Sequence, residues 1–372
     1  MQRRGEAIRR DAHEATTRAV DKGRAPDLAA TDLPRLPVSD NETGAVTTLL
    51  KANEILRQHR WPPPYDRTRH QMVLGDARDL RFIDAESIHL VVTSPPYFNL
   101  KPYATDAGGR QLGRINDYEA FLEELDRVWR ECARVLVPGG RVCCVIGDIL
   151  IPRRADGRHR VLPLPSDIQV RSRKHGLDNL TPILWFKIGN RKVEARRKSS
   201  ACYGKPYQPG AIIKSDYEQI LMLRKPGGYR TTPMIQRALS MLNRDERANW
   251  MQPVWSGIPG ASLRDGHSAP FPLEIAERLI RLFSFAGDTV LDPFAGSGTT
   301  AVAATRVGRN SISVEIEEQY LNAAIQRVML ATELTYSGGH TGIIETVVVR
   351  SRGPSGAEKL HCNPDLVQPV GD

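Results

Sequence analysis

The chain has 372 residues, of which 40% are hydrophobic, and its formal charge is +9 at pH 7. A mean hydropathy of -0.38 and the lack of an apolar run of membrane length predict a soluble, cytoplasmic protein without a membrane span. The charged amino terminus excludes a secretory signal. Five cysteines without a CxxC pair predict neither a zinc site nor a disulfide framework. A pI near 9.4 indicates attraction to polyanions, although many basic proteins bind no nucleic acid.

The chain divides into a polar arm, a regular middle and a tail. Residues 1–60 are predicted to form the arm, with one amphipathic helix over 47–60. Residues 61–335 are predicted to form the catalytic domain, and 336–372 a tail with one candidate strand at 341–350. Further strands are expected at 71–76, 88–92, 141–148, 180–188, 217–225, 288–294 and 310–316, and helices at 117–136, 273–284, 298–308 and 317–334. This alternation predicts an α/β fold with a doubly wound, mostly parallel sheet.

A glycine-rich turn, DPFAGSG, lies between the strand predicted at 288–294 and a helix of small residues. Gly296 and Gly298 lack side chains, so the backbone can approach a ligand closely there. Glu315 ends the next predicted strand, where a carboxylate can accept hydrogen bonds from both hydroxyls of a ribose. The alternative is a tight turn that only packs a helix on a sheet. The spacing is not GxGxxG, and Phe294 fills room that a pyrophosphate needs, so S-adenosyl-L-methionine fits better than a dinucleotide.

A second loop, TSPPY, ends the strand predicted at 88–92, because proline cannot continue a central ladder. Pro95 and Pro96 stiffen this loop, and the Ser94 hydroxyl and the Pro95 carbonyl can accept hydrogen bonds. Tyr97 offers an aromatic face. The set suits a planar base that bears an exocyclic amine. In isolation, however, these residues are more typical of a proline-capped edge turn with a core tyrosine.

Together, the two loops resemble the motifs of the amino-group DNA methyltransferases. TSPPY resembles the catalytic motif of that family, and DPFAGSGTT resembles its S-adenosylmethionine-binding motif. Further motifs of the family resemble the stretches GDARDL (75–80), ILWFK (183–187), YEQILMLRK (217–225), HSAPFPLEIAERLI (267–280) and SVEI (313–316). The resemblance spans roughly residues 71–332, with the catalytic motif first, as in the circularly permuted β group. It implies a Rossmann-like methyltransferase fold that uses S-adenosylmethionine and no metal.

The resemblance also implies the roles of particular residues. The catalytic residues would be Ser94, Pro95, Pro96 and Tyr97. The cofactor-binding residues would be Asp76, Phe271, Asp292, Pro293, Phe294, Gly296, Gly298, Thr299, Thr300 and Glu315. In this family serine before the two prolines usually accompanies methylation of cytosine N4, and aspartate that of adenine N6. Ser94 therefore predicts cytosine N4, with adenine N6 as the alternative.

The expected reaction is direct methyl transfer to a base that has been flipped out of double-stranded DNA. Tyr97 would stack on this base, with Phe98 or the Trp185 region opposite, although a lone tryptophan is more typical of a core. Methylation of cytosine C5 would need a cysteine nucleophile in the TSPPY loop, which has none. Cys143 and Cys144 lie in an apolar strand and are expected in the core.

A target-recognition region is predicted over 187–265, because residues 187–210 interleave cations with Gly and Tyr. A solvated surface loop is the alternative. The expected DNA-contacting residues are Arg191, Lys192, Arg196, Arg197 and Lys198. A cognate restriction endonuclease and a homodimer are further partners that the family resemblance leaves open. Two other classes compete: a non-catalytic nucleic-acid-binding protein, disfavoured by the intact loops, and a nicotinamide-dependent oxidoreductase, disfavoured by the FxGxG spacing.

Overall fold

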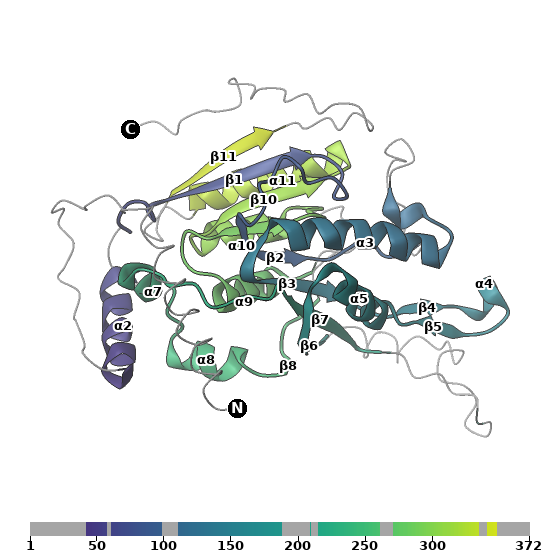
Figure 1. Ribbon diagram of the computed structural model, residues 1–372, viewed down its shortest axis with the longest axis horizontal. Helices are drawn as coiled ribbons and strands as arrows, with labels where there is room; N and C mark the ends of the chain where they lie inside the picture. Colours follow the sequence, from purple (N-terminus) through teal and green to yellow (C-terminus); the bar gives the residue numbers. More distant parts are fainter. Residues whose placement is uncertain are drawn as a thin grey trace, which may run out of the picture. The chain divides into compact units, whose positions relative to one another are not determined.

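The computed structural model describes residues 42–57, 61–98, 111–187, 209, 215–260, 271–334 and 341–347, all within one compact unit. These residues form a nine-stranded sheet in the order β11-β1-β10-β9-β2-β3-β7-β6-β8 (Figure 1). The strands are β1 Arg67–Leu74, β2 Ile88–Thr93, β3 Leu136–Ile146, β6 Asp178–Phe186, β7 Tyr217–Arg224, β8 Val254–Trp255, β9 Thr289–Asp292, β10 Asn310–Glu315 and β11 Thr341–Val347. A separate hairpin pairs β4 Ile149–Ile151 with β5 Arg160–Leu162.

The sheet is parallel from β11 to β3 and reverses at β7. β7 runs antiparallel to both β3 and β6, so β6 points the same way as β3. The predicted α/β fold with a doubly wound, mostly parallel sheet is therefore confirmed. As a consequence, the carboxyl ends of β1, β10, β9 and β2 share one edge with the end of β6 and the beginning of β7. Chain order reverses between β9 and β2, which is where ligands bind in such sheets.

Helices cover both faces of the sheet (Figure 1). The helices are α2 Glu42–Arg57, α3 Tyr118–Val135, α4 Arg153–Asp156, α5 Leu164–Ser172, α7 Met234–Leu239, α8 Arg244–Trp250, α9 Leu273–Phe283, α10 Thr299–Arg306 and α11 Glu318–Leu334. Val91 of β2 packs with α3 and α5 in one hydrophobic cluster, whereas its neighbours Leu90 and Val92 pack with α9 in another. This alternation follows from the two-residue period of a strand. Both faces of β2 are thus buried, as its apolar run requires.

Most of the predicted elements are present, with shifted ends. The Asp117 side chain caps α3 by accepting a hydrogen bond from the Ala120 N–H at 2.8 Å. β3 begins five residues before the predicted strand, so the PGG stretch (138–140) lies inside it rather than in a stop between helix and strand. α2 begins at Glu42, ahead of the predicted start at 47, and residues 58–60 lie outside the described part. Some elements were not predicted from the sequence, because they are short and have weak periodicity. They are α5, α7, α8 and the β4–β5 hairpin.

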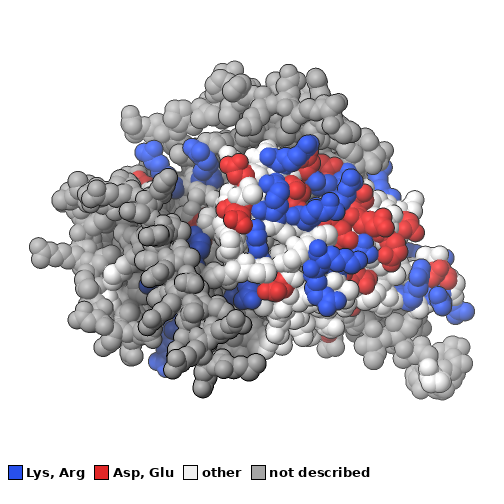
Figure 2. Space-filling model, viewed as in Figure 1, with Lys and Arg blue, Asp and Glu red and all other residues white. Residues whose placement is uncertain are grey.

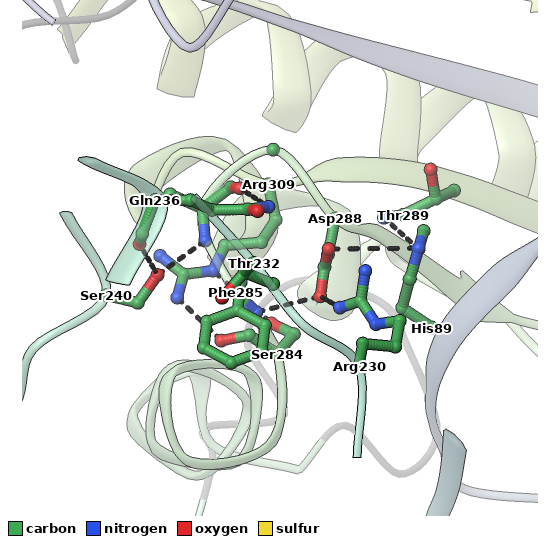
Figure 3. A network of polar contacts seen from close by, with 12 residues as sticks. His89, Arg230, Thr232, Gln236, Ser240, Ser284, Phe285, Asp288, Thr289 and Arg309 are labelled. Atoms are coloured by element: carbon green, nitrogen blue, oxygen red, sulfur yellow. Dashed lines mark hydrogen bonds and ion pairs between the residues drawn. The ribbon is translucent and has the colours of Figure 1, made fainter. Parts of the chain in front are cut away.

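The amino-terminal edge of the parallel strands is closed by a polar network (Figure 3). Asp288, which is 2% exposed, accepts hydrogen bonds from Arg230 and from the Phe285 N–H and lies 3.8 Å from His89 Nε2. The buried Arg309 donates to the Ser284 carbonyl at 2.9 Å, and burial lowers its pKa to about 9. At this edge β2 is joined to β9 by a hydrogen bond from the Thr289 N–H to His89 Nδ1 at 3.1 Å, and the cations Arg230 and Arg309 donate to the segments that precede β9 and β10.

Charges of both signs intermingle on the face that carries α3 and α5 (Figure 2). On α3, Arg127 pairs with Glu124 and Arg134 with Glu131, and Arg171 of α5 reaches Asp126. The described part of this face is therefore not uniformly basic, despite the chain's net positive charge. Among the described helices, none is long and apolar enough to cross a membrane.

Candidate active site

A cavity of about 690 Å³, partly open to solvent, lies at the carboxyl edge of the sheet. Its walls come from the segments that follow four strands: β1, β2, β9 and β10. The lining residues are Gly75, Asp76, Ala77, Ser94, Pro95, Pro96, Tyr97, Gln111, Leu112, Pro293, Phe294, Gly296, Val314, Glu315, Ile316 and Tyr320. Apolar side chains with a few polar groups among them are typical of the lining of a small-molecule site. The two loops singled out in the sequence, which lie far apart along the chain, thus share one cavity.

Asp292 ties the two loops together beneath the cavity. Its carboxylate accepts hydrogen bonds from the hydroxyls of Thr93 and Thr300, each at 2.7 Å, and from the Phe294 N–H at 3.1 Å. The side chain is 2% exposed and does not line the cavity. Burial raises the pKa of Asp292 to about 6. Asp292 therefore fixes the end of β2 against the end of β9, and its geometry is that of a support rather than a wall.

Glu315 does line the cavity, and it also holds the glycine-rich turn. Its Oε2 accepts from the Gly296 N–H at 2.8 Å, and its Oε1 accepts from the N–H groups of Ile316 and Glu317, each at 3.0 Å. Burial raises the pKa of Glu315 to about 7. A carboxylate has about four lone-pair positions, so these three hydrogen bonds leave capacity for a ligand hydroxyl.

The two glycines of the turn have different roles. Gly296 has φ 51° and lines the cavity. Gly298 has φ 76°, and a Cβ there would lie 2.8 Å from the Cβ of Ala324 on α11. Gly298 thus allows close packing of α10 on α11, which is a packing role between two helices and differs from the helix-on-sheet packing that the sequence offered as an alternative. Thr299 and Thr300, which begin α10, are buried and lie outside the cavity lining.

Of the remaining predicted cofactor residues, three line the cavity and one lies in the hydrophobic core. Pro293 and Phe294 line the cavity, as does Asp76, whose carboxylate accepts hydrogen bonds from Arg78 at 2.6 and 2.9 Å. Phe271 is 9% exposed and packs in the hydrophobic cluster of α9. It does not contribute to the cavity wall formed by the described residues.

All four predicted catalytic residues, 94–97, line the cavity. Phe98 points away from it: its ring lies 5.4 Å from that of Tyr118 and 5.5 Å from that of Phe121, in the core under α3. Trp185 is 1% exposed and donates to the Ile258 carbonyl at 3.0 Å. The core interpretation of Trp185 is confirmed, and neither ring faces Tyr97 across the cavity.

Several wall residues had no signal in the sequence. Gln111 donates to Glu317 Oε1 at 3.2 Å, and Tyr320 stands on the first turn of α11. Both lie outside the recognised motifs, so only the tertiary fold brings them to the cavity. Glu218 lies within the stretch 217–225, but the sequence assigned it no role. In the structure its Oε1 accepts a hydrogen bond from the Tyr97 hydroxyl at 3.1 Å.

The predicted DNA contacts Arg191, Lys192, Arg196, Arg197 and Lys198 lie outside the described residues. The cysteines within the described ranges, Cys132, Cys143 and Cys144, are buried and free. Burial raises the pKa of Cys143 to about 12, which keeps its thiol protonated and inert. The core assignment of Cys143 and Cys144 is confirmed.

A family model for N6 and N4 methyltransferases, described as DNA methylase, matches residues 88–326. The chain belongs to this DNA methylase family. The match begins at the first residue of β2 and ends in α11, so it includes both cavity loops.

Related proteins agree with this assignment. The methylase is 36% identical to type II methyltransferase M.MjaI of Methanocaldococcus jannaschii over 277 residues, which is 68% of this chain and 88% of that protein. It is 27% identical to the DNA adenine methyltransferase YhdJ of Escherichia coli, over 82% of this chain and 97% of that protein. Among solved structures, the putative DNA modification methylase TTHA0409 of Thermus thermophilus, crystallised with S-adenosyl-L-methionine, is 45% identical, with a TM-score of 0.60 over 77% of this chain and 100% of that one.

Proposed function

We propose that this DNA methylase transfers a methyl group from S-adenosyl-L-methionine to the exocyclic N4 of cytosine in double-stranded DNA. The observation that carries the proposal is the meeting of two loops in one cavity. Ser94, Pro95, Pro96 and Tyr97 form one wall, and the turn held by Glu315 forms another. One loop suits an amine-bearing base and the other suits a nucleoside cofactor.

The cavity has the donor set that S-adenosyl-L-methionine requires. Glu315 would accept a ribose hydroxyl at its remaining lone-pair position, and Phe294, Ile316 and Tyr320 would supply apolar surface for the adenine ring. A buried carboxylate without a cationic partner favours a cationic ligand, which a sulfonium compound is. The Thermus relative crystallised with S-adenosyl-L-methionine supports the same choice. When bound, this cofactor supplies an electrophilic methyl group.

The residues of the catalytic loop would prepare the amine. In a free base the nitrogen lone pair is delocalised into the ring, which makes the amine a poor nucleophile. The Ser94 hydroxyl and the Pro95 carbonyl would accept hydrogen bonds from the amine and hold its lone pair out of the ring. Tyr97 would stack on the base. Positioning and fixed dipoles would then supply most of the rate, without a covalent enzyme intermediate.

The choice of cytosine rests on Ser94. Its hydroxyl can accept from the amine and can also donate toward N3 of cytosine. The second candidate is adenine N6, which the similarity to the E. coli adenine methyltransferase supports. Both candidates require a flipped base and the same cavity.

The wider role follows from the kind of relative. The M. jannaschii protein is a type II methyltransferase. This supports a place for the chain in a restriction-modification system with a cognate endonuclease. Target recognition by residues 187–265, with contacts from Arg191, Lys192, Arg196, Arg197 and Lys198, rests on the charge of that segment. Assembly as a homodimer is part of the same proposal.

The deciding experiment incubates the protein with methyl-labelled S-adenosyl-L-methionine and mixed-sequence DNA, then digests the DNA to nucleosides. We expect label on N4-methylcytosine and roughly 100-fold less label with the Tyr97→Ala variant, since stacking of a base on an aromatic ring is worth about 1–3 kcal/mol and its loss also misplaces the amine. Label on N6-methyladenine would replace the cytosine assignment. No transfer to any DNA would contradict the proposed function.

A further inference from the structure

A charged pair stands directly behind the tyrosine of the catalytic loop. The Tyr97 hydroxyl donates to Glu218 Oε1 at 3.1 Å, and the same oxygen accepts from the Lys187 ammonium. Glu218 is 14% exposed and Lys187 is 39% exposed. Glu218 is therefore largely buried next to Tyr97, whereas Lys187 is partly exposed.

The reversal of the sheet at β7 explains why these residues meet. Glu218 is the second residue of β7 and pairs with Trp185 of β6. Because β7 is antiparallel to β3, its beginning lies at the edge where β2 and β3 end. Lys187 follows the last residue of β6 and reaches the same edge. The Tyr97 loop and the residue after β6 thus both reach the carboxylate of Glu218 on β7.

The surroundings of Glu218 restrict its movement. A Cβ at residue 147 would lie 3.2 Å from Glu218 Cγ, so Gly147 leaves just enough room for this side chain. The Lys187 ammonium lies 4.9 Å from the centre of the Trp185 ring, and the Trp185 indole is itself anchored by its hydrogen bond to Ile258. A largely buried carboxylate would cost free energy without a partner, and Lys187 supplies the compensating charge.

We propose that Glu218, held by Lys187, is a positioning residue that fixes the Tyr97 ring in the plane needed to stack on the target base. The inference rests on the proposed function, because it assigns to Tyr97 the contact with the base. Glu218 would act through its hydrogen bond to the Tyr97 hydroxyl and would not touch the reacting atoms. Lys187 is also the first residue of the proposed recognition region, so the same pair joins that region to the catalytic loop.

The first arm of the test uses the protein without DNA. Hydrogen exchange at the amides of Ser94 and Tyr97 reports how firmly the loop is held. We expect exchange about tenfold faster in Glu218→Ala and in Tyr97→Phe, which lose the same hydrogen bond. Glu218→Gln keeps an acceptor oxygen for the tyrosine and should exchange as the parent protein does. Glu86→Gln is the matched control, because it breaks the Glu86–Lys225 ion pair at the amino-terminal edge of the parallel strands, opposite the cavity.

The second arm measures methyl transfer to DNA and the affinity for S-adenosyl-L-methionine. Glu218→Ala and Tyr97→Phe should each lower kcat/KM for DNA about tenfold while the affinity for S-adenosyl-L-methionine stays within about twofold. The double variant should lose no more than either single one, because both act on one contact. Glu218→Gln should retain kcat/KM within about threefold. A loss in Glu218→Gln equal to that in Glu218→Ala would instead indicate proton transfer by the carboxylate.

The two arms separate the two proposals. Unchanged exchange in Glu218→Ala, or losses that multiply in the double variant, would overturn the positioning role. A parent protein that transfers no methyl group would contradict the proposed function alone. In that case the exchange measurements still decide whether Glu218 fixes the tyrosine.

Discussion

Three deeply buried carboxylates, one at the amino edge of the parallel sheet and two at the carboxyl edge, have different kinds of partner. At the amino edge, Asp288 faces Arg230 and His89 (Figure 3). At the carboxyl edge, Asp292 and Glu315 accept hydrogen bonds from threonine hydroxyls and backbone N–H groups, which are neutral. All three side chains are at least nine-tenths buried. These three carboxylates therefore differ in charge compensation rather than in burial.

The difference in charge compensation distinguishes a carboxylate that only stabilises the fold from carboxylates at the candidate active site. A buried carboxylate that accepts hydrogen bonds from a cationic partner joins segments through charge-assisted hydrogen bonds. Without such a partner, burial raises the pKa, to about 6 for Asp292 and about 7 for Glu315. A perturbed group in a cavity wall, as Glu315 is, is typical of a binding site, because an incoming ligand can supply a further donor or a positive charge. The site thus carries a cost in stability that the opposite edge does not.

The largest expected effect compares one substitution at the two edges. Asp288→Asn should lower the free energy of unfolding by about 3 kcal/mol at pH 7, since it leaves Arg230 without its carboxylate and removes a negative charge that acts on the buried Arg309. Asp292→Asn should change it by less than about 1 kcal/mol, because an amide can satisfy both threonines and carries no buried charge. Urea unfolding of the two variants and the parent protein measures these changes in the free energy of unfolding.

The pH dependence of these variants checks the same comparison. Burial raises the pKa of Asp292 from its ordinary value of 3.8 to about 6, so the folded state holds this proton more tightly than the unfolded one. Ionisation of Asp292 therefore lowers stability as pH rises from about 4 to about 6. Asp292→Asn should lose this part of the pH dependence. Equal losses of stability in both variants at pH 7 would refute the distinction between the edges.

Removing Glu315 should affect ligand binding more than Asp288→Asn does. We expect Glu315→Ala to weaken the binding of S-adenosyl-L-methionine about 100-fold, which equals about 2.7 kcal/mol, since hydrogen bonds to a charged acceptor contribute about 1.5–3 kcal/mol each. Isothermal calorimetry measures the affinity, and Asp288→Asn at a temperature where it is folded serves as the control. An affinity equal to that of the parent protein would exclude Glu315 from the cofactor site.

Gly176 and Gly298 have the same φ of 76°, so substitutions at the two positions distinguish the cost of a steric clash from the cost of backbone strain. Gly298→Ala should destabilise the protein by about 2 kcal/mol, because it adds a contact of 2.8 Å with Ala324 to the strain of a left-handed alanine. Gly176→Ala has open space and should cost only about 1 kcal/mol, the strain alone. Thermal unfolding checks the difference. Equal effects would mean that α11 yields to the added methyl group.

The smallest expected effect is a pH dependence of cofactor binding. Burial raises the pKa of Glu315 to about 7, and its ionised form is the stronger acceptor for a ligand hydroxyl. Affinity for S-adenosyl-L-methionine should therefore fall as pH drops below about 7, by at most about tenfold per pH unit, or about 1.4 kcal/mol. Glu315→Gln should flatten this dependence above about pH 5. A flat profile in the parent protein would contradict the ionised role of Glu315.

Local chemistry determined the two loops. Two prolines must end a strand at residue 94, and glycines followed by small residues must make a tight turn into a helix, whatever the rest of the chain does. Alternation of strands and helices determined that both loops would lie at carboxyl ends of parallel strands. The sequence therefore predicted the cavity, its four catalytic-loop residues, and Glu315 at its wall. It also predicted that Cys143 and Cys144 lie in the core.

Only the tertiary structure decided which residues support the site and which form its wall. Asp292 and Gly298 belong to the same motif as Gly296, yet one lies beneath the cavity and the other packs against α11. Glu218 and Lys187 reach Tyr97 because β7 reverses direction, and strand direction is set by long-range pairing that local sequence patterns do not encode. Residue types and spacing thus fix the chemistry available in a loop, whereas sheet pairing decides which distant groups complete it.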